Sequence, residues 1–181
     1  MDESDAALVE RCRAGGDAAF RELIDRYKNL VYGVIFRTVA DRSRADDLAQ
    51  EVFLRVHRGL PSFRGDSSLS TWLFRIVRNV CVETRDRRRF ERSLDALVSD
   101  DRPGVDPGAH DRAFATIELR DRLDKAMSRL PPAARFLVSA HYLGGQKYED
   151  LARALDMPIG TVKTHLYRAK RRLRELLEMR S

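Results

Sequence analysis

The chain has 181 residues, a length that suits one or two small domains, and 43% of them are apolar, enough to form a core. Its formal net charge is +6 and its isoelectric point is about 9.7, which indicates a polyanionic partner. The polar, acidic start MDESDAALVERCRAGG is no signal peptide, and no apolar run approaches the roughly 18 residues of a membrane span. These features favour a cytoplasmic protein over a secreted or membrane-spanning one.

No motif in the sequence predicts catalysis or metal binding. The two cysteines, Cys12 and Cys81, lie in different predicted helices and form no CxxC or Cys/His cluster. His141 and His165 have no partner at ligand spacing. The chain shows no Ser/His/Asp set and no glycine-rich phosphate loop. We therefore expect no catalytic residue, no metal, no cofactor and no small-molecule substrate.

Two helices are expected at the start of the chain. A short helix over residues 5–14 should end at Gly15 and Gly16. A long amphipathic helix should follow and pack in the core beside the next one. Its apolar residues at helical spacing are Phe20, Leu23, Ile24, Tyr27, Val31 and Ile35.

The next predicted helix is strongly polar on one side. Ser43 and Asp46 match a capping box, so the helix should begin at Ser43, and Gly59 and Pro61 should end it. Its apolar side carries Leu48, Val52, Phe53 and Val56. Its polar side carries Asp47, Gln50, Glu51 and Arg55. From composition alone, we expect this segment to be a core helix whose outer face meets only solvent.

A polar loop containing Phe63 leads to another helix, which should begin near Leu69. Trp72 falls on the core face of that helix by its spacing. The apolar stripe consists of Leu69, Trp72, Leu73, Ile76, Val77 and Val80. The other face is basic and can form hydrogen bonds through Arg75, Arg78 and Asn79. The arginine-rich residues 84–92 extend this helix, either as a solvated end or as contacts to phosphates.

The composition changes between Ser93 and about Arg112, where Pro, Gly and Asp replace the apolar period. This change predicts a flexible, acidic linker over residues 93–113. The linker would join a first helical domain, residues 1–92, to a second one, residues 114–181.

The second domain is predicted to contain a helix-turn-helix. Two short helices should precede it, separated by Pro131 and Pro132, and the first has apolar residues at Leu119, Leu123, Met127 and Leu130. In YEDLARALDMPIGTVKTHLYRAKRRLRELL, a short helix, a turn at Asp156–Pro158 and a long helix follow one another. Many such motifs have glycine at the position of Asp156, but aspartate also adopts left-handed backbone angles. The inner stripe of the last helix comprises Val162, Leu166, Ala169, Leu173 and Leu176.

The outward face of the last helix is basic near its N-terminal end, the part that a recognition helix places in the major groove. Lysine and arginine there can donate to guanine O6 and N7. The residues on this face are Lys163, Thr164, Tyr167, Arg168 and Arg171.

Two sets of strings resemble the extracytoplasmic-function (ECF) group of bacterial sigma factors. DDLAQEVFLRV, FRGDSSLSTWL and RIVRN resemble sigma region 2, and MPIGTVKTHLYRAKRRLRE resembles region 4.2. The resemblance implies that Asp47, Gln50 and Glu51 bind the clamp of the largest RNA polymerase subunit. It implies contacts to the single-stranded promoter −10 element by Phe63, Arg75, Arg78 and Asn79. It implies contacts to the duplex −35 element by Lys163, Thr164, Tyr167, Arg168 and Arg171.

The expected protein is therefore an all-α sigma factor of two small helical domains, which binds core RNA polymerase and directs promoter recognition and melting. The resemblance adds the flap of the second-largest polymerase subunit and an anti-sigma factor as partners. An operator-binding helix-turn-helix regulator, dimeric on a palindrome, stays open as an alternative. An enzyme is a third class, without a supporting motif.

Overall fold

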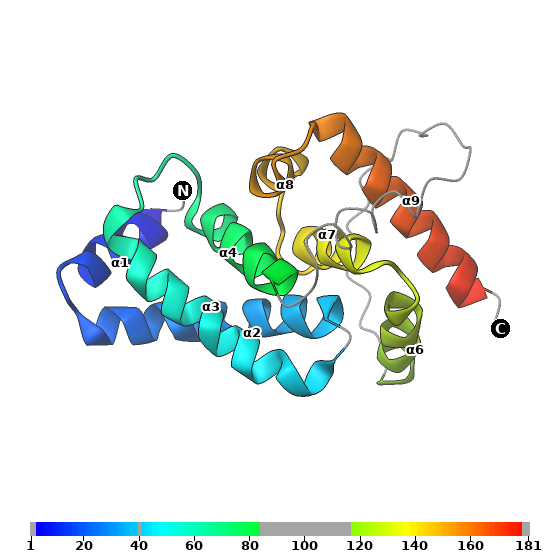
Figure 1. The fold of residues 1–181 in the computed structure, drawn as a ribbon, viewed down its shortest axis with the longest axis horizontal. Coiled ribbons are helices and arrows are strands. Elements are labelled where there is room, and N and C mark those ends of the chain that lie inside the picture. Colours follow the sequence, from blue (N-terminus) through cyan, green and yellow to red (C-terminus); the bar gives the residue numbers. More distant parts are fainter. Residues whose placement is uncertain (1–2, 40, 84–116, 179–181) are drawn as a thin grey trace.

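The chain folds into α-helices and short 3₁₀ turns over the residues that the structure, a computed structural model, describes: 3–39, 41–83 and 117–178 (Figure 1). No strand occurs in these ranges, and the predicted all-α fold class is confirmed. The predicted linker over 93–113 and the arginine-rich residues 84–92 lie outside the described residues.

The first helical group consists of α1 (Glu3–Arg13), α2 (Asp17–Thr38), α3 (Ala45–Gly59) and α4 (Leu69–Glu83). Helix α2 packs against the other three, as expected for the long amphipathic helix of the core. Its buried side includes Leu23, Val31 and Ile35. The chain turns between α1 and α2 at Gly15, whose φ of 83° favours a residue without a Cβ.

The capping box predicted at the start of α3 is wrong. A 3₁₀ turn over Arg42–Arg44 precedes the helix, and the Ser43 hydroxyl donates to Asp41 Oδ1 at 2.6 Å instead. The Ser43 amide donates to the same oxygen at 3.1 Å. Both hydrogen bonds lower the pKa of Asp41, and the bond from the hydroxyl has the larger effect. The predicted end of α3 at Gly59 is confirmed. A Cβ at Gly59 would lie 2.9 Å from Trp72 Cζ2, so the ring of Trp72 leaves room for glycine alone.

The second helical group consists of α6 (Ile117–Ser128), α7 (Pro132–Tyr142), α8 (Tyr148–Leu155) and α9 (Ile159–Glu178). Helices α8 and α9 form the predicted helix-turn-helix, and the whole predicted inner stripe of α9 is buried. Asp156 ends α8 with φ 54° and ψ 50°, in the left-handed region. The prediction that aspartate takes the place of glycine in this turn is therefore confirmed.

The left-handed backbone of Asp156 predicts how substitutions there act on stability. Asp156→Gly is expected to change the free energy of unfolding by less than about 1 kcal/mol, because glycine adopts these angles without strain. Asp156→Val should lower it by about 1–2 kcal/mol, because a β-branched residue is disfavoured there. Urea unfolding followed by circular dichroism measures both values. Equal stability of the two variants would contradict this prediction.

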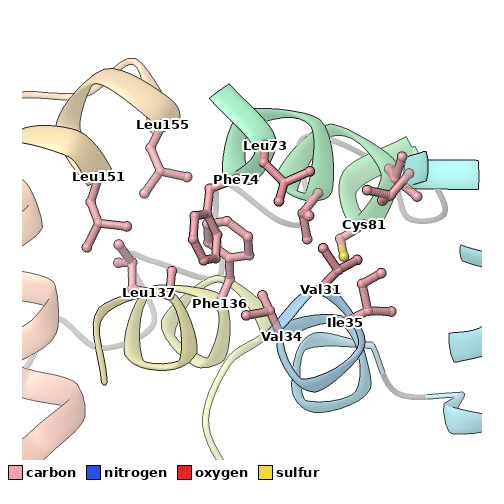
Figure 2. Close-up of a cluster of buried hydrophobic side chains, with 14 of the residues drawn as sticks. Val31, Val34, Ile35, Leu73, Phe74, Cys81, Phe136, Leu137, Leu151 and Leu155 are labelled. Carbon is pink, nitrogen blue, oxygen red and sulfur yellow. The ribbon is translucent and has the colours of Figure 1, made fainter. Parts of the chain in front are cut away.

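The two helical groups pack against each other, with α7 on α2 and α8 on α4 (Figure 1). Figure 2 shows one apolar cluster that runs from α2 and α4 into α7 and α8. Within it, the rings of Phe74 and Phe136 meet edge to face, with centroids 6.5 Å apart and planes at 78°. A Cβ at Gly144 would collide with the Phe74 ring, so only glycine allows this approach. The sequence predicts two domains, but it does not predict this contact between the two helical groups.

Candidate nucleic-acid and protein interface

The residues predicted to bind polymerase lie together on the outer side of α3, and we call Asp47, Gln50 and Glu51 the acidic stripe. Asp47 and Gln50 are exposed, and 39% of the Glu51 side chain is accessible. The opposite side of the helix, including Leu48 and Val52, is buried in the core. Helix α3 therefore presents the polar oxygens of the stripe to solvent, where a protein partner can reach them.

Leu54, which was not among the predicted site residues, lies four residues after Gln50 and seven after Asp47 and so shares their side of α3. Its exposed fraction is 44%. A leucine at helical spacing within a polar stripe is the signal that would have found it. It gives the acidic stripe an apolar neighbour for a partner to cover.

Arg55 connects the acidic stripe to α4. Its Nε donates to Glu51 Oε1 at 2.7 Å, and its Nη1 and Nη2 donate to the two carboxylate oxygens of Glu83 at 2.7 and 2.6 Å. Such bidentate pairing is the stronger kind of charge-assisted hydrogen bond. The bonds to Glu83 and then Glu51 raise the pKa of Arg55, and Arg55 in turn lowers the pKa of Glu83. The Glu51 carboxylate is thereby held in a defined orientation.

The Arg55–Glu83 pair predicts a pH dependence of stability. Because the pKa of Glu83 is lower in the folded chain than its ordinary 4.5, the pair stabilises fully above pH 4.5 and loses its effect as the pH falls through the folded pKa. The pair is largely exposed, so we expect its effect to stay below about 1 kcal/mol. The free energy of unfolding in urea should differ between the wild type and Glu83→Gln, and this difference should narrow at acid pH. A difference that is constant with pH would contradict the linkage.

Phe63, predicted to help hold a flipped −10 base, is buried, with an exposed fraction of 5%. Its ring lies against Trp72, with centroids 5.0 Å apart. A base can stack on Phe63 only after the ring leaves this position, so its −10 role stays a prediction. Trp72 packs against the core, on the side that its spacing predicted.

The other three predicted −10 residues lie on α4. Arg75 and Asn79 are exposed and Arg78 is half-buried, with its Nη1 donating to Asn79 Oδ1 at 3.4 Å. Arg75 is engaged within the protein, because its Nη2 donates to the main-chain carbonyl of Arg153 at the end of α8, 3.0 Å away. The structure thus places these three residues on one helix, and that helix touches the second helical group.

The five residues predicted to read −35 DNA all lie on α9, and we call them the basic face: Lys163, Thr164, Tyr167, Arg168 and Arg171. Lys163 and Arg171 are exposed, and the other three are half-buried. Lys163 Nζ lies 5.9 Å from the centre of the Tyr148 ring, and Arg171 Nε donates to Glu175 Oε1 at 3.3 Å. The basic face begins at the N-terminal end of α9, which is the end that a recognition helix directs toward base edges.

An apolar groove that was not predicted from the sequence is lined by α2, α6, α7 and α9 and has a volume of about 750 Å³. Leu123, Tyr142 and Leu143 line it and are exposed. The basic side chains along it belong to Arg37, Lys170 and Arg174. Leu123 belongs to the apolar period of α6, but a period does not reveal whether another helix covers each of its members.

In the described part of the chain, no three His, Cys, Asp or Glu side chains gather as a metal site. His141 Nδ1 lies 2.7 Å from the carbonyl oxygen of Gln146, its ring stacks on Tyr148, and His165 is buried in α9. No helix among the described residues has the length and apolar character needed to cross a bilayer.

Comparison with protein families matches both helical groups. The model of sigma-70 region 2 matches residues 23–91, and the model of sigma-70 region 4 matches residues 120–173. The chain is 34% identical to the ECF RNA polymerase sigma-E factor of Haemophilus influenzae, over 97% of this chain and 94% of that one. It is 32% identical to the RNA polymerase sigma-H factor of Pseudomonas aeruginosa, over 97% of this chain and 95% of that one.

Solved structures show a similar fold. The sigma factor RpoE from Bartonella quintana, crystallised with the anti-sigma factor NepR, is 26% identical and matches with a TM-score of 0.66 over 90% of this chain and 98% of that one. CnrH in complex with the cytosolic domain of CnrY has a TM-score of 0.69 at 20% identity, over 99% of this chain and 100% of that one. With both regions matched in order and relatives aligned along nearly the whole length, the chain belongs to the sigma-70 family, in the ECF group of RNA polymerase sigma factors.

Proposed function

We propose that this chain directs core RNA polymerase to promoters through three separate surfaces. The acidic stripe on α3 binds the clamp of the largest subunit, α4 and the loop before it bind the opened −10 strand, and the basic face of α9 binds duplex −35 DNA. The observation that carries the proposal is the separation of charge in the structure: the carboxylates of the stripe face solvent on α3, and the cations gather on α9 in the other helical group. We assign these roles to domains of residues 1–92 and 114–181, joined by the acidic linker 93–113.

The proposed mechanism is differential binding and involves no covalent chemistry by this chain. Unstacking a promoter base costs a few kcal/mol. Stacking of a base on an aromatic side chain contributes about 1–3 kcal/mol, and the arginines of α4 add attraction to phosphates. The protein melts the −10 element because it binds the open strand better than the duplex, which shifts the population toward the open state.

We propose that the apolar groove holds apolar side chains from the flap of the second-largest polymerase subunit. Leu123, Tyr142 and Leu143 are exposed there and form a surface that a partner can desolvate. This second attachment would fix the distance between the two DNA-binding surfaces on the polymerase.

The test of the proposed function is run-off transcription with purified core RNA polymerase and a promoter from the region upstream of this protein's own coding sequence. We expect specific transcripts only when the chain is added. Gel filtration should show a monomer that co-elutes with core polymerase. Failure to associate with core polymerase would refute the proposal.

An operator-binding regulator is not favoured, because it would leave the acidic stripe without a partner and because both sigma regions are matched in this chain. Members of this family act as DNA-recognition subunits, and we propose that this chain likewise has no enzymatic activity and works in the cytoplasm. The complex of RpoE with NepR supports an anti-sigma factor as a further partner of this chain.

A further inference from the structure

Helix α1 belongs to none of the three surfaces proposed above, and it precedes residue 23, where the match to sigma-70 region 2 begins. It is nevertheless held firmly in the first helical group. Leu8 and Val9 are buried. Asp5 is also buried, and its two oxygens accept hydrogen bonds from Tyr27 Oη at 2.7 Å and Arg26 Nη1 at 2.8 Å. A buried carboxylate that is satisfied on both oxygens fixes α1 on α2.

The last turn of α1 contacts the start of the loop that carries Phe63. There α1 packs against the 3₁₀ turn Leu60–Ser62, and Arg13 Nε donates to the main-chain carbonyl oxygen of Leu60 at 3.3 Å. The same oxygen accepts a hydrogen bond from the amide of Phe63 at 3.2 Å. A carbonyl oxygen has two lone pairs and can accept both bonds. One arginine of α1 therefore binds the group that holds the backbone of Phe63.

The hydrogen bond from Arg13 has a defined geometry. Arg13 Nη1 donates to Glu10 Oε1 one turn earlier on α1, so the planar guanidinium is oriented from its own helix. Only 31% of the Arg13 side chain is accessible, which partly shields the bond to Leu60 from water. The Ser62 hydroxyl donates to the carbonyl of Gly59 at 2.9 Å and secures the same turn. The start of the loop is thus anchored at two successive carbonyl groups.

This anchor matters because the Phe63 ring must move before a base can stack on it. The ring lies against Trp72, with centroids 5.0 Å apart. With the backbone held, only the side-chain bonds of Phe63 rotate when a base arrives. With the backbone released, binding must also order the loop, and that loss of conformational freedom lowers the affinity.

We propose that Arg13 is a positioning residue for the opened −10 strand: through the Leu60 carbonyl it holds the backbone of Phe63 in place for base stacking. The inference rests on the proposed role of Phe63 at the −10 element. Arg13 itself touches no DNA in this arrangement. Helix α1 acts as the support of the loop, so part of the −10 surface is built by residues that precede the matched region 2.

The test measures how holoenzyme assembled from the full chain and core polymerase binds a fluorescein-labelled single strand that carries the −10 element of the run-off promoter. Arg13→Ala should weaken this binding about fivefold, the effect expected when one partly solvated hydrogen bond is lost, and should leave the affinity for core polymerase unchanged. Arg13→Gln removes the charge but places an amide nitrogen as many bonds from the backbone as Arg13 Nε. It should restore most of the binding.

Arg11→Ala is the matched control, because it removes the same charge from the same helix. The Arg11 side chain is 56% accessible and pairs with Glu22, away from the loop. This variant should bind the strand like the wild type. A loss equal to that of Arg13→Ala would mean that the charge of α1, and not the bond to Leu60, governs binding, and would overturn the proposal.

Two further readouts separate positioning of Phe63 from a general role in stability. Trp72 is the one tryptophan of the chain, and the Phe63 ring covers it. Quenching of its fluorescence by acrylamide in the free protein should increase in Arg13→Ala and stay at the wild-type value in Arg13→Gln and Arg11→Ala. In a Phe63→Leu background, Arg13→Ala should weaken strand binding no further, because coupled residues are not additive.

Strand binding by Arg13→Ala that equals or exceeds that of the wild type would overturn the inference. Additive losses in the double variant would overturn the action through Phe63. If Phe63→Leu does not fold, Phe63→Met, with a more adaptable apolar side chain, takes its place in the cycle. Failure of the wild-type holoenzyme to bind the strand would overturn the −10 role of the loop and this inference with it, whereas a defect confined to Arg13→Ala leaves the proposed function intact.

Discussion

Charge reversal of the acidic stripe, Asp47→Lys combined with Glu51→Lys, is expected to abolish binding to core RNA polymerase while the chain still folds. Removing one partner of a charge pair that is buried at an interface weakens binding by about 2–5 kcal/mol. Two charge reversals should therefore weaken the affinity for core polymerase by at least about 100-fold. The cost to folding is small, because Asp47 is exposed in the first turn of α3, where a carboxylate contributes about 0.3–1 kcal/mol. Arg55 loses Glu51 but keeps both hydrogen bonds to Glu83.

The affinity is measured by fluorescence anisotropy with purified core polymerase, and the fold by thermal circular dichroism. The matched control is Asp25→Lys combined with Asp121→Lys, which changes the net charge equally at side chains that are 69% and 63% exposed. The control should bind core polymerase like the wild type. Equal losses in the two double variants would mean that total charge, not the stripe, governs binding, and normal binding of the stripe variant would remove the stripe from the interface.

Lys163→Ala and Arg168→Ala are each expected to weaken −35 recognition and to leave core binding intact. Both residues lie on the basic face of α9, so neither contributes to the acidic stripe or to the buried inner side of the helix. A side chain that donates to guanine O6 and N7 contributes about 1–3 kcal/mol to discrimination, which corresponds to a loss of about 5- to 150-fold in affinity. A side chain that contacts only a phosphate would weaken binding to all sequences alike and lower the salt slope by about 1.

Binding of promoter and scrambled −35 duplexes by the assembled holoenzyme, measured at several salt concentrations, separates these two kinds of contact. Lys125→Ala is the control for Lys163→Ala, because it removes the same charge from an exposed position on α6. If Lys125→Ala weakened promoter binding as much as Lys163→Ala, the basic face would act only through net charge. Loss of core binding in either α9 variant would contradict the proposed separation of surfaces.

Local signals predicted the helices well where they act within one turn of the chain. Gly59 ended α3, α4 began at Leu69, and Asp156 took the left-handed position after α8. The capping box failed because the Ser43 amide, which the box would pair with the Asp46 carboxylate, donates to Asp41 Oδ1, two residues earlier. A spacing rule does not weigh two carboxylates that compete for one amide.

Among the candidate site residues, the exposure of the acidic stripe and of the basic face was predictable, because the 3.6-residue period decides which side chains share a face. The burial of Phe63 was not predictable. It depends on where Trp72 lies once the loop has folded back against α4. Phe74 was also missed, because it falls outside the apolar stripe predicted for α4 and is buried by the other helical group.

By itself, the sequence determined the helices, the helix-turn-helix, and the sets of charged side chains that share one face. Only the tertiary structure decided that α7 lies on α2 and α8 on α4, that Phe74 meets Phe136, and that Arg37 pairs with Asp124. The period of a helix reports which of its sides is apolar, not which distant segment covers that side. The choice of neighbour depends on how two surfaces from remote parts of the chain fit together at close-packed density.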